Sequence, residues 1–133
     1  MKLALANGAM FPTEIDYVSA YGPGHPMLDA TEVDVLKKVF GDHINHIPIN
    51  SIKGVTGNAL SAGGPFQLAA CALTIRDQLV APTANYEFPD PRCDLDFVQG
   101  RPRKTKVDCA LLNVRGLGGS ASTMIVNRVC PDE

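Results

Sequence analysis

Residues 51–64 read Ser-Ile-Lys-Gly-Val-Thr-Gly-Asn-Ala-Leu-Ser-Ala-Gly-Gly, and they join a short strand-like run to a long apolar segment. The join carries one lysine, Lys53, and one asparagine, Asn58. In α/β proteins the chemistry gathers where the carboxyl end of a strand opens onto the start of a helix. The stretch therefore predicts an α/β fold and the place of its functional site.

The rest of the chain supplies further strands and helices around this stretch. Runs rich in β-forming residues predict strands at 15–21, 47–52, 95–98, 106–114 and 120–129. Apolar spacing and end signals predict helices at 1–10, 29–40 and 59–79. The order predicts one α/β domain over residues 1–133, with a mixed β-sheet, packed helices, parallel first strands and a closing antiparallel hairpin.

Two details of the helices bear on function. Small and apolar residues occupy all sides of 59–79, which predicts a helix buried between layers, and Pro65 should kink it or mark its true first turn. Asp29 and Glu32 lie one turn apart at the start of 29–40. They fit either a catalytic carboxylate pair or first-turn acids that complement the helix dipole, and the second interpretation is favoured.

Composition excludes several classes of function. The chain has 133 residues, a formal charge of -2 and 45% hydrophobic residues, so neither a disordered chain nor a nucleic-acid binder is favoured. The longest apolar stretch, 66–73, is far shorter than the roughly 20 residues of a membrane span. The apolar run at the N-terminus is too brief for a secretory signal. We expect a cytoplasmic protein with no nucleic-acid or membrane partner.

The four cysteines lie far apart, without the close pairs of zinc sites, so we expect no metal site. Cys71 and Cys109 sit in apolar runs and should be buried thiols, whereas Cys93 and Cys130 should lie in a loop or tail.

Six blocks occur in an order and spacing that match one enzyme family. They are Asp16-Tyr17-Val18-x-Ala20-x-Gly22, Pro26-x-x-Asp29-x-x-Glu32, Ser51-x-Lys53-Gly54-x-Thr56-Gly57, Pro82-Thr83-x-Asn85, Asp94-Leu95-Asp96 and Asn113-x-x-Gly116-x-Gly118-Gly119. Together they closely resemble the C-terminal part of β-ketoacyl-acyl-carrier-protein synthases (ketosynthases), the condensing enzymes of fatty-acid and polyketide synthesis. The resemblance covers essentially the whole chain.

The resemblance implies a thiolase-like fold, of which this chain is most of the C-terminal half. It also implies that the half with the nucleophilic cysteine, and the first strand of this half, are absent. The family's substrates are carried on the phosphopantetheine of acyl carrier protein, and the resemblance implies no further cofactor. The expected partners are a separate N-terminal-half chain or further copies of this chain, with acyl carrier protein as another candidate. A basic cluster fits either such a carrier or a solvated loop: Arg101, Arg103, Lys104 and Lys106.

In the resembled family two histidines and a lysine handle the malonyl thioester. Lys53 matches the lysine, with Glu32 as its implied partner, but Tyr21 and Asn58 stand where the histidines belong. The family's histidine loop also supplies two threonines for the phosphopantetheine arm, and here both are replaced. His25 lies beside the position of the missing histidine. It fits either a substitute base or a solvent-exposed loop residue, and the second interpretation is favoured.

The family's gating turn, Gly-Phe-Gly-Gly, is here Gly116-Leu117-Gly118-Gly119. Its glycines are expected to form a hairpin turn with positive φ, because strands flank them on both sides.

These replacements predict a loss of chemistry. The Tyr21 hydroxyl and the Asn58 amide can donate hydrogen bonds, but neither exchanges a proton near neutral pH as histidine does. Losing a single oxyanion donor can cost about 10²- to 10³-fold in rate. We therefore expect a ketosynthase-like subunit that is not catalytic alone. The alternatives are an altered acyltransferase site completed by a partner's cysteine and a fragment without independent activity.

Overall fold

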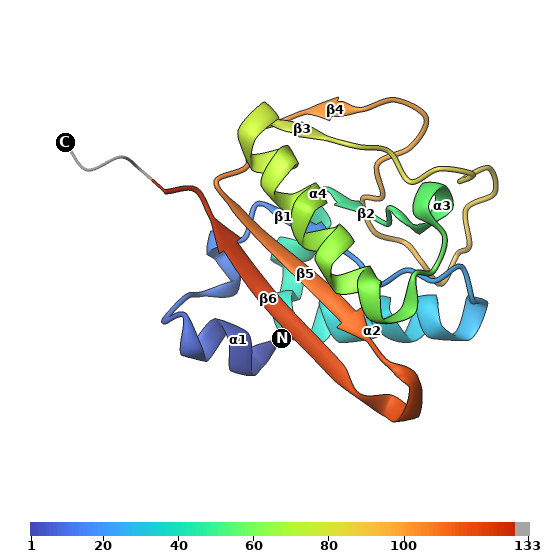
Figure 1. Ribbon diagram of the computed structural model, residues 1–133, viewed down its shortest axis with the longest axis horizontal. Helices are drawn as coiled ribbons and strands as arrows, with labels where there is room; N and C mark the ends of the chain where they lie inside the picture. The colour runs from blue at the N-terminus through green and yellow to red at the C-terminus, as the bar shows by residue number, and fades with distance from the viewer. Residues whose placement is uncertain (130–133) are drawn as a thin grey trace.

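The computed structural model describes residues 1–129, so Cys130 lies outside the described residues. At its centre is a four-stranded sheet with the order β2-β1-β5-β6 (Figure 1). The strands are β1 (Tyr17–Ser19), β2 (Ile49–Asn50), β5 (Cys109–Arg115) and β6 (Ala121–Asn127). β1 runs parallel to β2 and β5, and β6 forms an antiparallel hairpin with β5. The mixed sheet, the parallel first strands and the closing hairpin confirm the sequence prediction.

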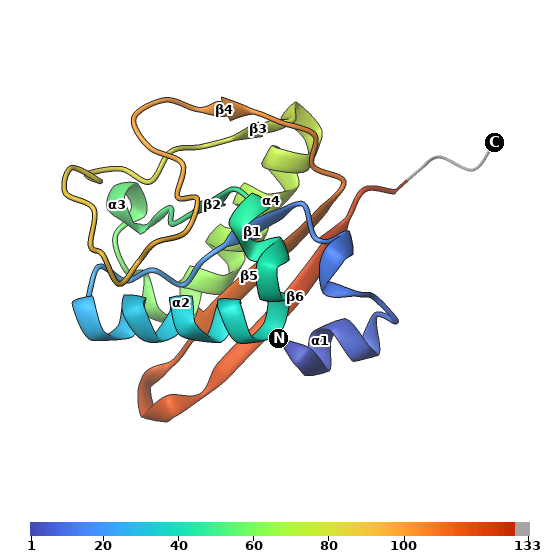
Figure 2. The same cartoon turned by 180° about the vertical axis from the view of Figure 1, so that it is seen from behind.

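Two long helices cover opposite faces of the sheet, α2 (Pro26–Phe40) and α4 (Gly63–Asp77). α4 lies in front of the sheet in Figure 1, and α2 lies in front in the reverse view of Figure 2. Successive residues of a strand face opposite sides. Accordingly, Leu111 joins the core under α2, whereas Leu112 packs with Cys71 of α4. The elements form three layers, helix on sheet on helix.

Shorter elements complete the chain. They are α1 (Lys2–Asn7), α3 (Lys53–Thr56), the pair β3 (Leu79–Val80) and β4 (Arg103–Lys104), and four 3₁₀ turns at Pro12–Glu14, Gly41–His46, Leu60–Ala62 and Leu117–Gly119. No helix among residues 1–129 is long and apolar enough to cross a membrane.

α2 begins at Pro26, earlier than the sequence predicts, because proline occupies its first turn and His25 caps its amino end. The earlier start moves Glu32 out of the first turn and into the interior, where it is 3% exposed. The interpretation of Glu32 as a first-turn acid is therefore wrong, while Asp29 does lie in the first turn.

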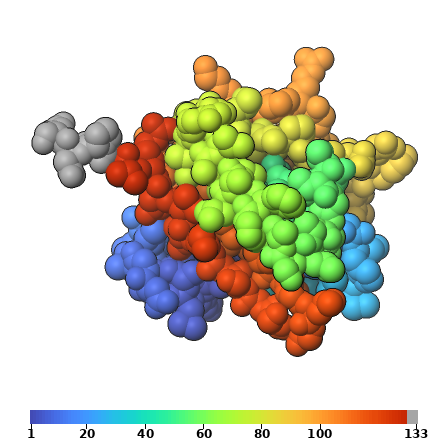
Figure 3. Space-filling view, viewed as in Figure 1, coloured from blue at the N-terminus to red at the C-terminus, as the bar shows by residue number. Residues whose placement is uncertain are grey.

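The predicted helix 59–79 is divided. A 3₁₀ turn at Leu60–Ala62 precedes α4. Pro65 lies in the first turn of α4, which confirms the expectation that it marks the true start of this helix. Among the described residues the sheet covers one face of α4, so only one of the two layers predicted around this helix is present in this chain. Figure 3 shows α4 at the surface of the chain. Three of its large apolar residues are exposed: Phe66, Leu68 and Leu73.

The connection between β3 and β5 holds less strand than the sequence predicts. The expected strand at 95–98 is reduced to one parallel bridge between Phe97 and Ile49. The antiparallel pair of β3 and β4 was not predicted from the sequence, since each strand has only two residues.

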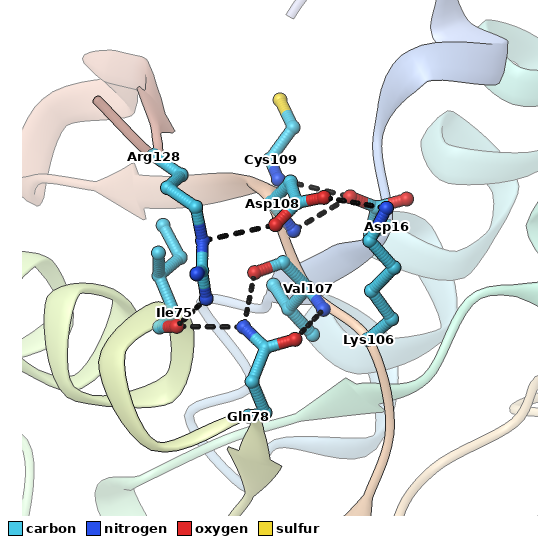
Figure 4. Close-up of polar contacts among 8 residues, drawn as sticks. All are labelled: Asp16, Ile75, Gln78, Lys106, Val107, Asp108, Cys109 and Arg128. Carbon is cyan, nitrogen blue, oxygen red and sulfur yellow. Dashed lines mark hydrogen bonds and ion pairs between the residues drawn. The ribbon is translucent and has the colours of Figure 1, made fainter. Parts of the chain in front are cut away.

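A polar cluster ties the end of α4 to the start of β5 (Figure 4). Gln78 ends α4 with a φ of 54°, and its side chain donates to and accepts from the backbone of Val107. Arg128 Nη2 donates to the carbonyl oxygen of Ile75, and Asp16 accepts two backbone N–H bonds at the start of β5. The cluster therefore lies at the amino ends of the parallel strands β1 and β5, opposite their carboxyl ends.

Candidate functional site

The carboxyl ends of β1 and β2 open onto a cleft of about 370 Å³. Its walls come from the strand ends, α2, α3 and the connection that follows β3. Three residues singled out from the sequence line it together: Lys53, Asn58 and Glu32. The location matches the strand-to-helix join at 51–64, and the catalytic roles remain predictions.

Glu32 fixes the chain where it leaves β1. Its Oε1 accepts from the backbone N–H of Tyr21 at 2.9 Å and from Asn113 Nδ2 at 2.7 Å, and its Oε2 accepts from the N–H of Gly22 at 2.9 Å. A buried carboxylate with three donors is a strong anchor, because each donor would otherwise be left unpaired. Glu32 therefore holds the backbone of the Tyr21 loop.

Lys53 begins α3 and is half-buried at the cleft. Its Nζ lies 4.7 Å from the centroid of the Tyr21 ring and donates to Gln67 Oε1 at 3.4 Å. No ion pair within 4.0 Å joins Lys53 to a carboxylate of residues 1–129, so the implied direct pairing with Glu32 is absent. Burial lowers the pKa of Lys53, and the charges of Glu32 and Asp29 partly oppose that change.

Asn58 lines the cleft, whereas Tyr21 and His25 lie beside it. Tyr21 contacts Lys53 through its ring, whereas Asn58 is exposed at the cleft wall. His25 is exposed, and its Nδ1 accepts from the N–H of Met27 at 3.3 Å as the cap of α2. This arrangement gives His25 a structural task at the helix end.

The turn Gly116–Gly119 joins β5 to β6, and none of its residues lines the cleft. Gly118 and Gly119 adopt φ values of 80° and 86°, which confirms the expected turn with positive φ. Leu117 is 87% exposed. The turn is the tip of the hairpin in this chain.

Two further polar groups lie at the site: Asp29, which the sequence identified only as a first-turn acid or a member of a carboxylate pair, and Gln67, to which it gave no role. Asp29 lines the cleft with a buried Oδ1 that has no hydrogen-bond partner, and burial followed by the Glu32 charge raises its pKa. Gln67 is fully buried in α4 beneath Lys53. The one amide within the apolar stretch 66–73 was the available signal for Gln67.

Thiols and basic residues fall mostly where the sequence places them. Cys71 and Cys109 are buried, as predicted, and Cys93 is partly exposed and lines the cleft. Within residues 1–129 no group of three His, Cys, Asp or Glu side chains could hold a metal ion. In the basic cluster, Arg103 pairs with Asp96 and Lys106 pairs with Asp108.

Comparison with known proteins defines the class. The family description "Beta-ketoacyl synthase, C-terminal domain" matches residues 1–87, and the chain belongs to this family. The resemblance found in the sequence is thereby confirmed.

Two individual relatives support membership of this family. The chain is 39% identical to 3-oxoacyl-[acyl-carrier-protein] synthase 2 of Coxiella burnetii over 97% of its own length and 31% of that protein. It is 41% identical to putative polyketide beta-ketoacyl synthase 1 of Streptomyces cyaneus, over 95% of the chain and 30% of the relative. The chain thus spans about a third of the length of these relatives.

Solved structures confirm the fold. One is a type II polyketide synthase acyl-carrier protein in complex with its ketosynthase, AntDE:AntF, with 35% identity and a TM-score of 0.94 over 97% of this chain and 32% of that one. The ishigamide ketosynthase/chain length factor has 29% identity and a TM-score of 0.91, over 97% of this chain and 32% of that one. The fold is the C-terminal half of the thiolase-like fold of ketosynthases.

Proposed function

We propose that this chain is a ketosynthase-like subunit of fatty-acid or polyketide synthesis that is not catalytic alone. It pairs with a separate ketosynthase chain, which supplies at least the N-terminal half. The observation that carries the proposal is the unpartnered apolar surface of α3 and α4. Its large members are Val55 of α3, Phe66, Leu68 and Leu73 of α4, and Leu60 of the 3₁₀ turn between the two helices, with exposed fractions from 37% to 80%.

Such a surface is costly to leave in water. Covering a large apolar side chain stabilises an assembly by about 25 cal/mol per Å² of apolar area removed from water. Contiguous apolar residues on one face are therefore typical of an interface. Phe66 and Leu73 are exposed on α4, although the composition of this helix predicts burial between layers. The mismatch supports a second layer, from a partner, on this side of α4.

The edge of the sheet supports the same proposal. β6 pairs only with β5 among the described residues, so the outer backbone groups of its seven residues are open to another strand. Open edges of this length are sites of strand addition. A partner that packs on α4 and adds a strand at β6 would complete the layers that the resemblance implies.

The site supports the absence of independent catalysis. A decarboxylative condensation needs a nucleophile and groups that stabilise enolate charge and manage a proton. Lys53, Asn58 and Tyr21 offer donors in or beside the cleft, but a tyrosine and an asparagine stand where the family has its two proton-exchanging histidines.

Two of the similar solved structures also fit the proposal. One is a ketosynthase with a chain length factor, and another is a ketosynthase in complex with an acyl-carrier protein. By analogy, this chain would assemble with a ketosynthase chain and would meet an acyl carrier protein through that complex.

Co-expression with a ketosynthase N-terminal half, followed by gel filtration and native mass spectrometry, tests the proposal. A one-to-one complex is expected. Phe66→Asp should weaken it by about tenfold or more, because an unpaired carboxylate would be buried against an apolar partner. Phe11→Asp is the matched control, since Phe11 is 72% exposed and lies outside α3 and α4. A monomeric chain that associates with no such partner would overturn the proposal.

One alternative has an observation in its favour. Lys53 and Asn58 line the same cleft, so an altered acyltransferase site completed by a partner's cysteine is consistent with the geometry. Transfer of acyl groups from acyl carrier protein by the complex, without decarboxylation, would support this alternative over a non-catalytic subunit.

A further inference from the structure

Gln67 is the fully buried polar side chain of α4, with 0% exposure. Its carboxamide lies between the carboxyl ends of β1 and β5. Nε2 is within hydrogen-bond distance of four oxygens: Ser19 O at 3.0 Å, Ser19 Oγ at 3.3 Å, Ala20 O at 2.9 Å and Asn113 O at 3.2 Å. A carboxamide nitrogen has two hydrogens, so acceptors outnumber donors here.

This surplus of oxygens fixes the orientation of the amide. The opposite orientation would place Oε1, which cannot donate, against the same acceptors and would leave Nε2 facing a lysine. The observed orientation instead directs Oε1 toward Lys53 Nζ at 3.4 Å. The backbone at the two strand ends thereby determines which atom of Gln67 meets the lysine.

The lysine head group has no stronger anchor. Nζ lies over the Tyr21 ring and within 4.0 Å of no carboxylate of residues 1–129. The contact with Gln67 is longer than an ordinary hydrogen bond, so it guides the ammonium group rather than holding it rigidly. The ring face and the amide oxygen together define one place for the charge.

We propose that Gln67 is a positioning residue that transmits the geometry of the β1 and β5 ends to Lys53 and keeps its ammonium group over Tyr21 in the cleft. The functional meaning of this role rests on the proposed function, because it assumes that the cleft is the retained ketosynthase site. The positioning itself is a property of the chain alone. Glu32 does the complementary task for the backbone of Tyr21, since its carboxylate accepts that residue's N–H.

Apart from Gln67, the groups that face Lys53 come from two elements, α2 and the loop after β1. Glu32 and Asp29 on α2 raise its pKa, while burial lowers it, and the Tyr21 ring faces it from the loop after β1. A change at Gln67 alters none of these groups directly. A shift in the titration of Lys53 in a Gln67 variant therefore reports on the contact between the two side chains.

The test is a pH titration of the lysine side chains by NMR on the full 133-residue chain. Gln67→Met removes the oxygen that favours the ammonium form, so the pKa of Lys53 should fall by about half a pH unit. Gln67→Glu places a carboxylate nearby, so the pKa should rise. Nuclear Overhauser contacts between the Lys53 Cε protons and the Tyr21 ring should weaken in Gln67→Met.

Thr74→Val is the matched control, because Thr74 is another buried polar residue of α4. It should lower the melting temperature without moving the Lys53 titration. If Gln67→Met lowers the melting temperature as Thr74→Val does but leaves Lys53 unchanged, Gln67 is only structural and the proposal is wrong.

If the Gln67 variants do not fold, a measurement on the unmodified chain tests the proposal instead. The side-chain amide protons of Gln67 should exchange with solvent much more slowly than those of the exposed Gln99. Equal exchange rates would overturn the proposal. The lysine titration and the amide exchange are both measured on the chain without a partner. Failure of the complex to form would therefore count against the proposed function but not against the positioning role of Gln67.

Discussion

Removing the Glu32 carboxylate should destabilise the chain more than any other single change at the cleft. Glu32→Ala would leave the N–H groups of Tyr21 and Gly22 and the amide of Asn113 without their acceptor. Each buried donor left unpaired costs about 1–3 kcal/mol. Water can reach the half-buried loop in part, so the expected loss is about 3–6 kcal/mol in the free energy of unfolding.

That loss is a large fraction of the about 5–15 kcal/mol that stabilises a typical domain. Glu32→Gln keeps one acceptor oxygen but turns an NH₂ group toward a donor, so it should cost about 1–3 kcal/mol. Asp34→Ala, at an exposed position of the same helix, should change stability by less than about 0.5 kcal/mol.

Urea unfolding measures all three variants, with the slope of the transition used to check that unfolding remains two-state. Amide exchange at Tyr21 and Gly22 should also accelerate in Glu32→Ala. A loss below about 1 kcal/mol, close to that of Asp34→Ala, would show that the three donors find other acceptors, and would refute the anchoring role of Glu32.

Other positions give independent tests. Gly54→Ala would bring a Cβ atom to 2.6 Å from the carbonyl oxygen of Ala84, so it should cost about 1–3 kcal/mol in thermal melts. Gly63→Ala meets no atom within 4 Å and should stabilise the chain by about 0.5–1 kcal/mol, so equal effects of the two alanines would contradict the packing of α3. N-ethylmaleimide at pH 8 should modify the partly exposed Cys93 well before the buried Cys71, as peptide mass mapping would show. Burial raises the pKa of Cys71 to about 12, so the unfolded state releases this proton first and stability should fall as pH rises from 9 toward 12, a fall that should be smaller in Cys71→Ala.

The sequence was informative where local patterns agreed with the final packing. The runs of β-forming residues around β5 and β6, the glycines between them and the end signals of α2 predicted elements that the structure contains. It failed at one helix start and at two very short strands. α2 starts at Pro26 because His25 caps it, and the two-residue strands β3 and β4 are too short to have a periodicity.

The site could be located from the sequence but not assembled from it. The strand-to-helix join at 51–64 and the motif spacing identified Lys53, Asn58 and Glu32, which line one cleft. The pattern could not show that Glu32 turns toward backbone amides, nor that Lys53 meets Gln67 instead. Those choices depend on side-chain directions across three layers, which spacing along the chain does not encode.

The most direct test of the central claim is release of labelled CO₂ from malonyl-acyl carrier protein by the complex of this chain with a ketosynthase N-terminal half. The account predicts no release above background for the unmodified complex, and a gain of activity when Tyr21→His and Asn58→His are introduced together. Steady release by the unmodified complex that Lys53→Ala abolishes would contradict the claim that the site has kept its shape without its chemistry.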